Sequence, residues 1–226
     1  MSYTAPIYLY LFLPVVMLIY NLIPRKQRWI VLLTASYGFF ALISRELIIY
    51  LLLSTFSIHH FGLWISALQN ECKGEMEGLE KAERKEIKLT YQNRQRMVLL
   101  LAVILHVGLL LVLKYLNFFN ININGLLGAV NIPIMLPTFK FALPIGISFY
   151  TLQAVSYMMD VYRGTIKADK NLGRLALFMS FFPQIMEGPI CRYSQTAERL
   201  FEGNAITYKS MTWGWQRILW GMLKKM

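Results

Sequence analysis

Charged residues are scarce in this chain, and several familiar catalytic motifs are missing. Of its 226 residues, 15% are charged, whereas soluble domains carry about 25%. The nucleophile elbow G-x-S-x-G, the zinc motif H-E-x-x-H and the Walker A phosphate loop do not occur. The sequence therefore does not indicate the common hydrolase, metalloprotease or nucleotide-binding chemistries, and we predict no metal site.

Cysteine is also scarce. Cys72 and Cys191 form no metal-binding or redox motif, and we interpret them as unpaired thiols in a reducing compartment. The N-terminus has no basic segment before its first apolar run and no small-residue cleavage site after it. We therefore expect the first helix to be retained rather than removed as a signal peptide.

Hydrophobic residues make up 56% of the chain and fall in long blocks. Blocks of about 17–25 apolar residues match the hydrocarbon thickness of a bilayer, and the alternating strands of a membrane β-barrel are absent. The predicted fold class is all-α: a polytopic α-helical membrane protein with a single membrane domain over residues 1–226. We expect about five spanning helices, near residues 7–23, 29–43, 47–68, 97–113 and 141–159.

Two connectors between these spans have distinct compositions. Residues 69–96 hold seven basic and six acidic side chains, which predicts a charged, partly helical connector in water. A docking surface for a soluble partner is the alternative. Residues 117–140 are neutral and rich in asparagine, and we expect them to form a connector at the membrane interface.

The distribution of basic residues predicts the orientation. The net charge is +11, and no basic face exists outside the loops, so we do not expect a nucleic-acid partner. Lysine and arginine number fourteen in one set of loops and three in the other. The positive-inside rule then places the N-terminus outside and residues 69–96 in the cytoplasm of a bacterial inner membrane. The richer set is 24–28, 69–96 and 163–174; the poorer set is 1–6, 44–46 and 114–140.

The segment after the fifth span breaks the pattern. Residues 175–185 offer only eleven apolar-rich positions, interrupted by Pro183, which is short for a span. A crossing would also place the basic residues that follow on the outside. We therefore predict that residues 175–190 form a re-entrant element. Residues 208–226 begin a further, amphipathic helix.

Polar side chains in the fifth span are candidates for a functional site. Gln153, Ser156 and Asp160 follow i, i+3, i+7 spacing and share one helix face. A polar face on a spanning helix points into the bundle or a cavity. The alternative is that these residues hold helices together and that Asp160 pairs with Arg163.

A second polar group lies in FFPQIMEGPICRY, residues 181–193. Gln184, Glu187 and Arg192 surround Pro183 and two further helix-breaking residues. A broken helix with an ionisable residue is typical of a substrate site. Pairing of Glu187 with Arg192 is the alternative.

The three histidines are weaker candidates. His59 and His60 are adjacent and face different ways, and His106 stands alone in the fourth span. A histidine at membrane depth is a candidate functional group. Because none has a carboxylate or cysteine at ligand spacing, we interpret them as packed, hydrogen-bonded residues.

Four segments, KYLNFF, LPIGISFYTLQAVSYMMDVYRG, SFFPQIMEGPICRY and WGMLKKM, resemble the membrane-bound O-acyltransferase family in sequence, order and spacing. They are most similar to its bacterial alginate O-acetylation-type branch and cover most of residues 114–226, whereas residues 1–100 fit only in their helix pattern. The resemblance implies transfer of an acyl group, expected to be acetyl, to hydroxyls of an exported polysaccharide or cell-wall glycan. The donor implied is an acyl-CoA or a cytoplasmic acyl-carrier protein acting as co-substrate, with no bound cofactor. The other partners implied are the lipid bilayer and the extracytoplasmic glycan.

The family's catalytic histidine acts as a general base in a tunnel, and it lies downstream of the WGMLKKM segment. None of the three histidines here matches it, so we predict no catalytic residue and expect residues 1–226 to be an inactive N-terminal part of a longer enzyme. A non-catalytic transporter or export-complex scaffold is the alternative, although no internal repeat is seen. We expect these residues to line the substrate tunnel: Ser148, Gln153, Ser156, Asp160, Gln184, Glu187 and Arg192.

Overall fold

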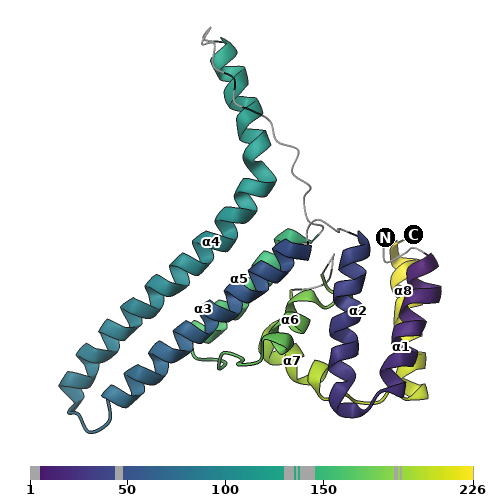
Figure 1. The fold of residues 1–226 in the computed structure, drawn as a ribbon, viewed down its shortest axis with the longest axis horizontal. Coiled ribbons are helices and arrows are strands. Elements are labelled where there is room, and N and C mark those ends of the chain that lie inside the picture. The colour runs from purple at the N-terminus through teal and green to yellow at the C-terminus, as the bar shows by residue number, and fades with distance from the viewer. Residues whose placement is uncertain are drawn as a thin grey trace.

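The computed structural model describes residues 6–43, 48–129, 146–185 and 190–225, together with Met135, Pro137 and Gly188. All regular structure in these residues is helical, as Figure 1 shows. The elements are η1 (Tyr8–Phe12), α1 (Leu13–Leu22), η2 (Arg25–Gln27), α2 (Arg28–Ile43), α3 (Ile48–Glu75), α4 (Lys81–Ala129), α5 (Ile147–Tyr162), α6 (Leu172–Ser180), α7 (Tyr193–Phe201) and α8 (Tyr208–Lys225).

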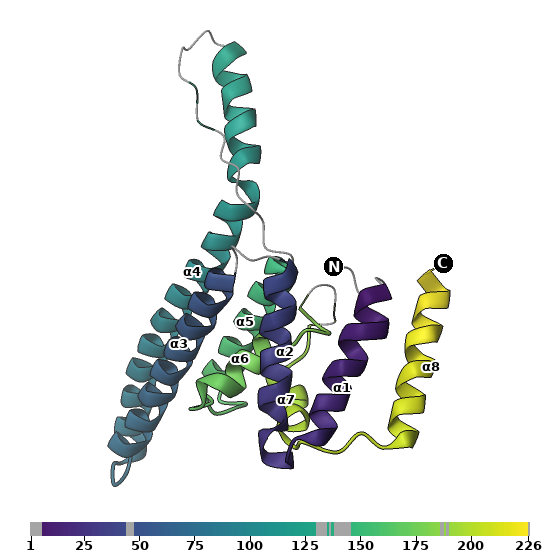
Figure 2. The same ribbon diagram turned by 45° about the vertical axis from the view of Figure 1, so that its right-hand side comes forward.

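The helices form two groups joined by α6. Helices α3, α4 and α5 pack against one another, while α1 lies beside α2 (Figures 1 and 2). The short helix α6 contacts α2, α3, α5 and α7, and every residue from Leu175 to Ser180 is buried. It therefore occupies the centre of the structure and connects the larger apolar core to the smaller, aromatic one around Phe39 and Phe182.

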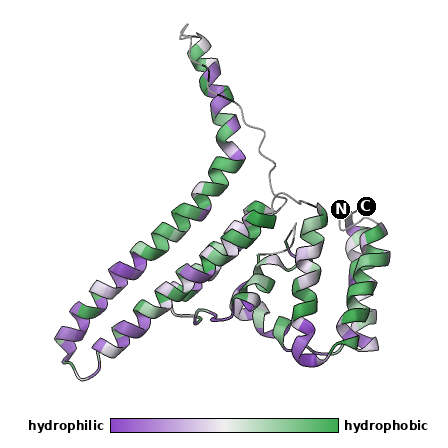
Figure 3. Cartoon of the chain, viewed as in Figure 1, coloured by the Kyte–Doolittle hydropathy of each residue, from purple (hydrophilic) through white to green (hydrophobic). Residues whose placement is uncertain are grey.

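Two helices, α3 and α4, are long and apolar enough to cross a membrane. Figure 3 shows their apolar middle sections and their polar tip. Helices α2 and α5 have 16 residues each, about 24 Å at 1.5 Å per residue, and η1 with α1 forms a shorter apolar helix. The architecture is that of a helical membrane protein, while the count of about five spans stays a prediction.

The helix that contains the fourth predicted span, α4, is much longer than the sequence predicted. The prediction of a connector over residues 117–140 is wrong in its first half, because α4 continues as a helix to Ala129. The end of α4 extends past α3 and α5 (Figure 1). The asparagines do not break the helix because their amides have partners. Asn122 Nδ2 donates to Phe118 O at 2.7 Å, and Asn120 Nδ2 donates to Pro137 O at 2.7 Å.

The charged segment 69–96 is the tip of a helical hairpin rather than a separate element. Helix α3 ends at Glu75 and α4 begins at Lys81, and most side chains there are exposed. The hydroxyl of Tyr91 donates to Glu75 Oε1 at 2.8 Å, which joins the two helices near the tip. The helical, solvent-exposed character follows the predicted pattern; the side of the membrane on which the tip lies stays a prediction.

Close contact between α3 and α5 depends on a glycine. A Cβ atom at Gly62 would lie 3.3 Å from the Tyr157 ring. Further along α3, Gln69 Nε2 donates to Val161 O at 2.8 Å, which satisfies a carbonyl in the last turn of α5. These contacts hold α5 in a fixed position against α3.

Replacing Gly62 with leucine is expected to destabilise the protein, because the added side chain collides with Tyr157. The expected loss in free energy of unfolding is about 1–3 kcal/mol, the usual effect of overpacking. It would be measured by denaturation in detergent micelles. Gly108→Leu is the matched control, since nothing lies within 4 Å of a Cβ at that helical glycine. Equal stability of the two variants would contradict the close α3–α5 contact.

Candidate functional site

The polar face of α5 is directed at α6. Gln153 is buried, and its Nε2 donates to Phe178 O at 2.9 Å. Phe178 lies in the last turn of α6, where helix carbonyls lack partners within the helix. Gln153 thus completes the hydrogen bonding of α6, which is the helix-to-helix contact that the alternative interpretation predicted.

Asp160 is buried on the same helix with an exposed fraction of 7%. The predicted pair with Arg163 is wrong: Arg163 is exposed, and no ion pair among the described residues reaches Asp160. Its Oδ2 has no hydrogen-bond partner. A buried polar atom without a partner is rare in folded proteins and marks Asp160 as a position to explain.

The other two α5 candidates lie apart from these. Lys114 Nζ of α4 donates to Ser148 Oγ at 3.5 Å, about three turns of α5 away from Asp160. Ser156 is half-buried. Ser148 and Gln153 therefore contact different neighbours, and the role of the four residues in a tunnel stays a prediction.

The second predicted group is only partly described. Gln184 lies in the turn after α6, where its Nε2 donates to Cys191 Sγ at 3.3 Å and its buried Oε1 has no partner. Glu187 lies outside the described residues, so its pairing stays a prediction. Arg192 is exposed and stands at the N-cap of α7.

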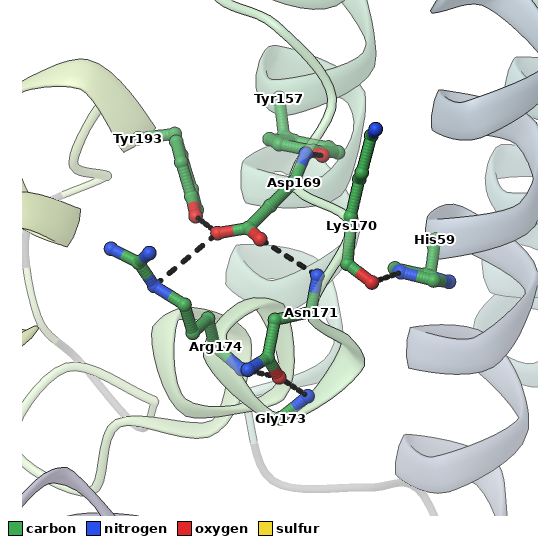
Figure 4. Close-up of polar contacts among 8 residues, drawn as sticks. All are labelled: His59, Tyr157, Asp169, Lys170, Asn171, Gly173, Arg174 and Tyr193. Atoms are coloured by element: carbon green, nitrogen blue, oxygen red, sulfur yellow. Dashed lines mark hydrogen bonds and ion pairs between the residues drawn. The ribbon is translucent and has the colours of Figure 1, made fainter. Parts of the chain in front are cut away.

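A polar network that the sequence did not predict is centred on Asp169 (Figure 4). Its Oδ2 accepts a hydrogen bond from the Tyr193 hydroxyl and pairs with Arg174 Nε at 3.5 Å. Its Oδ1 accepts from Asn171 N at 2.8 Å, and its backbone N–H donates to the Tyr157 hydroxyl at 3.1 Å. Asp169 thus joins three helices: its backbone N–H bonds α5, and its carboxylate bonds α7 and the first turn of α6.

This network shows that the chain after α6 comes back to the loop that precedes α6. Asp169 precedes α6 and Tyr193 is the first residue of α7, yet the two are hydrogen-bonded. Helix α6 has nine residues, about 14 Å at 1.5 Å per residue. Residues 175–190 are therefore not one continuous crossing helix. Where this element lies in the membrane stays a prediction.

The pKa of the Tyr193 hydroxyl is raised well above its usual value by burial and by its hydrogen bond to Asp169. The hydroxyl therefore keeps its proton and remains the donor in this pair. The only trace of the network in the sequence is an acid between Lys167 and Lys170 in an otherwise basic loop.

The histidines are used as packing and backbone-bonding groups. His106 is buried, and its Nδ1 lies 2.7 Å from Ala102 O; because a carbonyl only accepts, Nδ1 is the donor. His59 Nε2 likewise meets Lys170 O at 3.3 Å, while His60 is exposed. Among the described residues, no group of three His, Cys, Asp or Glu side chains could hold a metal ion.

No family model and no solved structure matches the chain. Its whole length is, however, similar to a protein of Azotobacter vinelandii named "probable alginate O-acetylase", at 30% identity over 225 residues. This similarity confirms the resemblance to the membrane-bound O-acyltransferase family that the four segments carry. The match covers 100% of this chain and 41% of the relative, so the chain spans about two fifths of the length of that protein.

Two further relatives are similar to shorter parts of the chain. A peptidoglycan O-acetyltransferase of Helicobacter pylori is 30% identical over 157 residues, covering 58% of this chain and 29% of the relative. A teichoic acid D-alanyltransferase of Bacillus subtilis is 43% identical over 49 residues, covering 22% of this chain and 12% of the relative. Similarity to the D-alanyltransferase is therefore local.

Removing the bond between Asp169 and Tyr193 is expected to destabilise the protein. Asp169→Asn and Tyr193→Phe should each lower the free energy of unfolding by about 1–3 kcal/mol, since a buried partner is left unsatisfied. The double variant should lose less than the sum, because both changes remove one interaction. Denaturation in micelles measures all three values.

Asp160→Asn is the matched control, because the carboxylate there has an unpartnered oxygen. Because no hydrogen bond to Oδ2 is lost, its free energy of unfolding should fall less than that of Asp169→Asn or Tyr193→Phe. Additive losses from Asp169→Asn and Tyr193→Phe would show that the two residues act independently and would contradict the network.

Proposed function

We propose that this chain forms the N-terminal part of a membrane O-acyltransferase that moves an acetyl group to hydroxyls of an exported polysaccharide or cell-wall glycan. The observation that carries the proposal is the similarity of the whole chain to an alginate O-acetylase. The shorter matches to a peptidoglycan O-acetyltransferase and a teichoic acid D-alanyltransferase support the same reaction class.

The proposed reaction takes an acyl thioester, carried by coenzyme A or by an acyl-carrier protein on the cytoplasmic side. The acceptor hydroxyl oxygen attacks the thioester carbonyl carbon, an ester C–O bond forms and the C–S bond breaks. The hydroxyl proton passes to a general base and then to the departing thiolate. By resemblance, a histidine downstream of the residues in this chain supplies that base, so this chain alone is inactive.

This chain would contribute the wall and the support of the tunnel. Gln153 fixes α5 against the end of α6 at 2.9 Å. Among the tunnel candidates that the structure describes, Asp160 Oδ2 and Gln184 Oε1 are buried oxygens without a partner, which in the proposal would bond water or substrate. In the proposal, the seven tunnel candidates line or support the tunnel, and none of them is the catalytic base.

The proposed membrane is the bacterial inner membrane, crossed several times with the N-terminus outside. In both ribbon views the α1–α2 connection lies at the same end of the molecule as the α3–α4 tip (Figures 1 and 2). Ten of the lysines and arginines lie in these two regions, three in residues 24–28 and seven in residues 69–96, where they belong to the ends of α3 and α4 beside the tip. A common, strongly basic end supports a cytoplasmic location for both.

The activity can be tested with the full-length protein produced in a strain that lacks its own polysaccharide acetylase. We expect ester-linked acetyl on the exported polysaccharide, measured by proton NMR, and none when residues 1–226 are produced alone. Gln153→Ala and Arg192→Ala should reduce acetylation by about tenfold or more, since small displacements of reacting groups have large effects on rate.

The exposed His60 provides the control variant: His60→Ala should leave acetylation unchanged. Immunoblots of membrane fractions check that all variants are present in equal amounts. Acetyl-free polysaccharide from the full-length protein would overturn the proposed activity. Full activity in both Gln153→Ala and Arg192→Ala would overturn the tunnel assignment alone.

The orientation can be tested with alkaline phosphatase, which is active only outside the cytoplasm. A fusion after Leu79, at the hairpin tip, should be inactive. A fusion after Asn124, in the extended end of α4, should be active because α4 has crossed the membrane by then. The opposite pattern would show that the N-terminus is inside.

A further inference from the structure

Six hydroxyl groups gather where α3 meets α2 and α5, at the end of these helices opposite the α3–α4 tip (Figures 1 and 2). They lie in the last two turns of α2 and within about two turns of the beginnings of α3 and α5. The rings of the three tyrosines among them belong to the larger apolar core or pack against it. The six residues are Tyr37, Tyr50, Ser54, Thr55, Tyr150 and Thr151.

Two of these hydroxyls bond directly to each other. Thr55 Oγ1 donates to Leu51 O at 2.7 Å, so it accepts from the Tyr150 hydroxyl, which lies 2.9 Å away. The rings of Tyr50 and Tyr150 meet edge to face, with their centres 6.3 Å apart. The ring of Tyr50, which belongs to α3, is thereby packed against α5.

The other four hydroxyls have no direct partner. Those of Tyr37, Tyr50, Ser54 and Thr151 are buried, and none is hydrogen-bonded within the part of the chain that the structure describes. Buried polar groups nearly always bond to protein or to ordered water. Four unpartnered hydroxyls at one place therefore indicate a small ligand that can both donate and accept hydrogen bonds.

Ser54 and Thr151 differ from the other buried serines and threonines in the described helices. The others each donate to the carbonyl oxygen four residues earlier, at 2.6–2.7 Å, which is the usual arrangement inside a helix. Ser54 and Thr151 leave that bond unmade. Their hydroxyls instead approach the hydroxyl of Tyr50, without forming a hydrogen bond to it. The residues that follow the usual arrangement are Ser36, Thr55 and Ser180.

The space at this cluster limits what can bind. The cavity that Tyr50 and Tyr150 help to line has a volume of about 10 Å³, about the room that one water molecule needs. A sugar unit or an acyl chain is far larger, so the site is closed and separate from a substrate tunnel. The six side chains are neutral and do not offset the charge of a buried cation.

We propose that one buried water molecule binds between the hydroxyls of Tyr50, Ser54 and Thr151 and joins α3 to α5. Its two protons and two lone pairs can bond all three, and about three hydrogen bonds are usual for a buried water. The Tyr37 hydroxyl lies beside Thr55 and is not part of this site. The proposal depends on the packing of α3 against α5 and not on the proposed acyl transfer.

The sign of a stability change tests the proposal in the full-length protein in detergent micelles. Tyr50→Phe and Thr151→Val each remove one hydroxyl with little change of shape. If water binds there, each change removes a hydrogen bond and should raise the equilibrium constant of unfolding by roughly two- to tenfold. If the hydroxyls are dry, each change removes the cost of burying an unpartnered group and should lower that constant, which would overturn the proposal.

Tyr208→Phe is the matched control, because the Tyr208 side chain is 81% exposed, and it should leave the equilibrium constant unchanged. The double variant Tyr50→Phe with Thr151→Val should lose less stability than the sum of the single losses, since both hydroxyls share one water. Additive losses would overturn the shared site. If Thr151→Val does not fold, Ser54→Ala replaces it in both measurements.

The water itself can be observed by determining the structure of the full-length protein at a resolution that shows ordered solvent. We expect one density peak at about 2.7–3.2 Å from each of the three hydroxyl oxygens. Direct bonds among the hydroxyls, with no peak between them, would overturn the proposal. Stabilisation of the protein by sodium chloride relative to N-methylglucamine chloride, lost in Tyr50→Phe, would identify the ligand as a cation and overturn it as well.

Discussion

The central constraint in this structure is that α6 is a nine-residue helix whose last six residues are buried, so its end groups need hydrogen-bond partners from outside the helix. At the first turn of α6, Asn171 Oδ1 accepts from Gly173 N at 2.9 Å and from Arg174 N at 3.3 Å. At the other end, Gln153 of α5 donates to a terminal carbonyl. Ser36 of α2 accepts from Phe182 N in the following turn at 3.2 Å.

This constraint explains why an apolar helix such as α5 contains polar residues. Gln153 of α5 and Ser36 of α2 belong to helices that would otherwise have no need of an amide or hydroxyl at these positions. The same reasoning separates Gln153, whose amide is used, from Asp160, whose Oδ2 has no partner. Stability accounts for Gln153. It does not account for Asp160, which is therefore the better position at which to look for a role in transport or catalysis.

The general features of the fold were predictable from the sequence because they depend on composition along the chain. Long apolar blocks predicted the helical membrane fold, and the short segment with Pro183 predicted a helix break rather than a membrane crossing. The end of the fourth helix was predicted wrongly, because the asparagines there bond within α4 and to Pro137, which the sequence does not show. The Asp169 network was missed because Tyr193 is 24 residues away along the chain. Four ordered segments carried the family resemblance, whereas the roles of single residues depend on three-dimensional contacts.

The bond between Asp169 and Tyr193 also sets an order for assembly during synthesis. Ser36 and Gln153 leave the ribosome before α6, so two of the groups that satisfy its far end are already in place when it emerges. Tyr193 is made afterwards, and until then Asp169 lacks its hydroxyl partner. The hydrogen bonding around α6 can therefore be completed only after α7 has been synthesised, although α6 itself is made earlier.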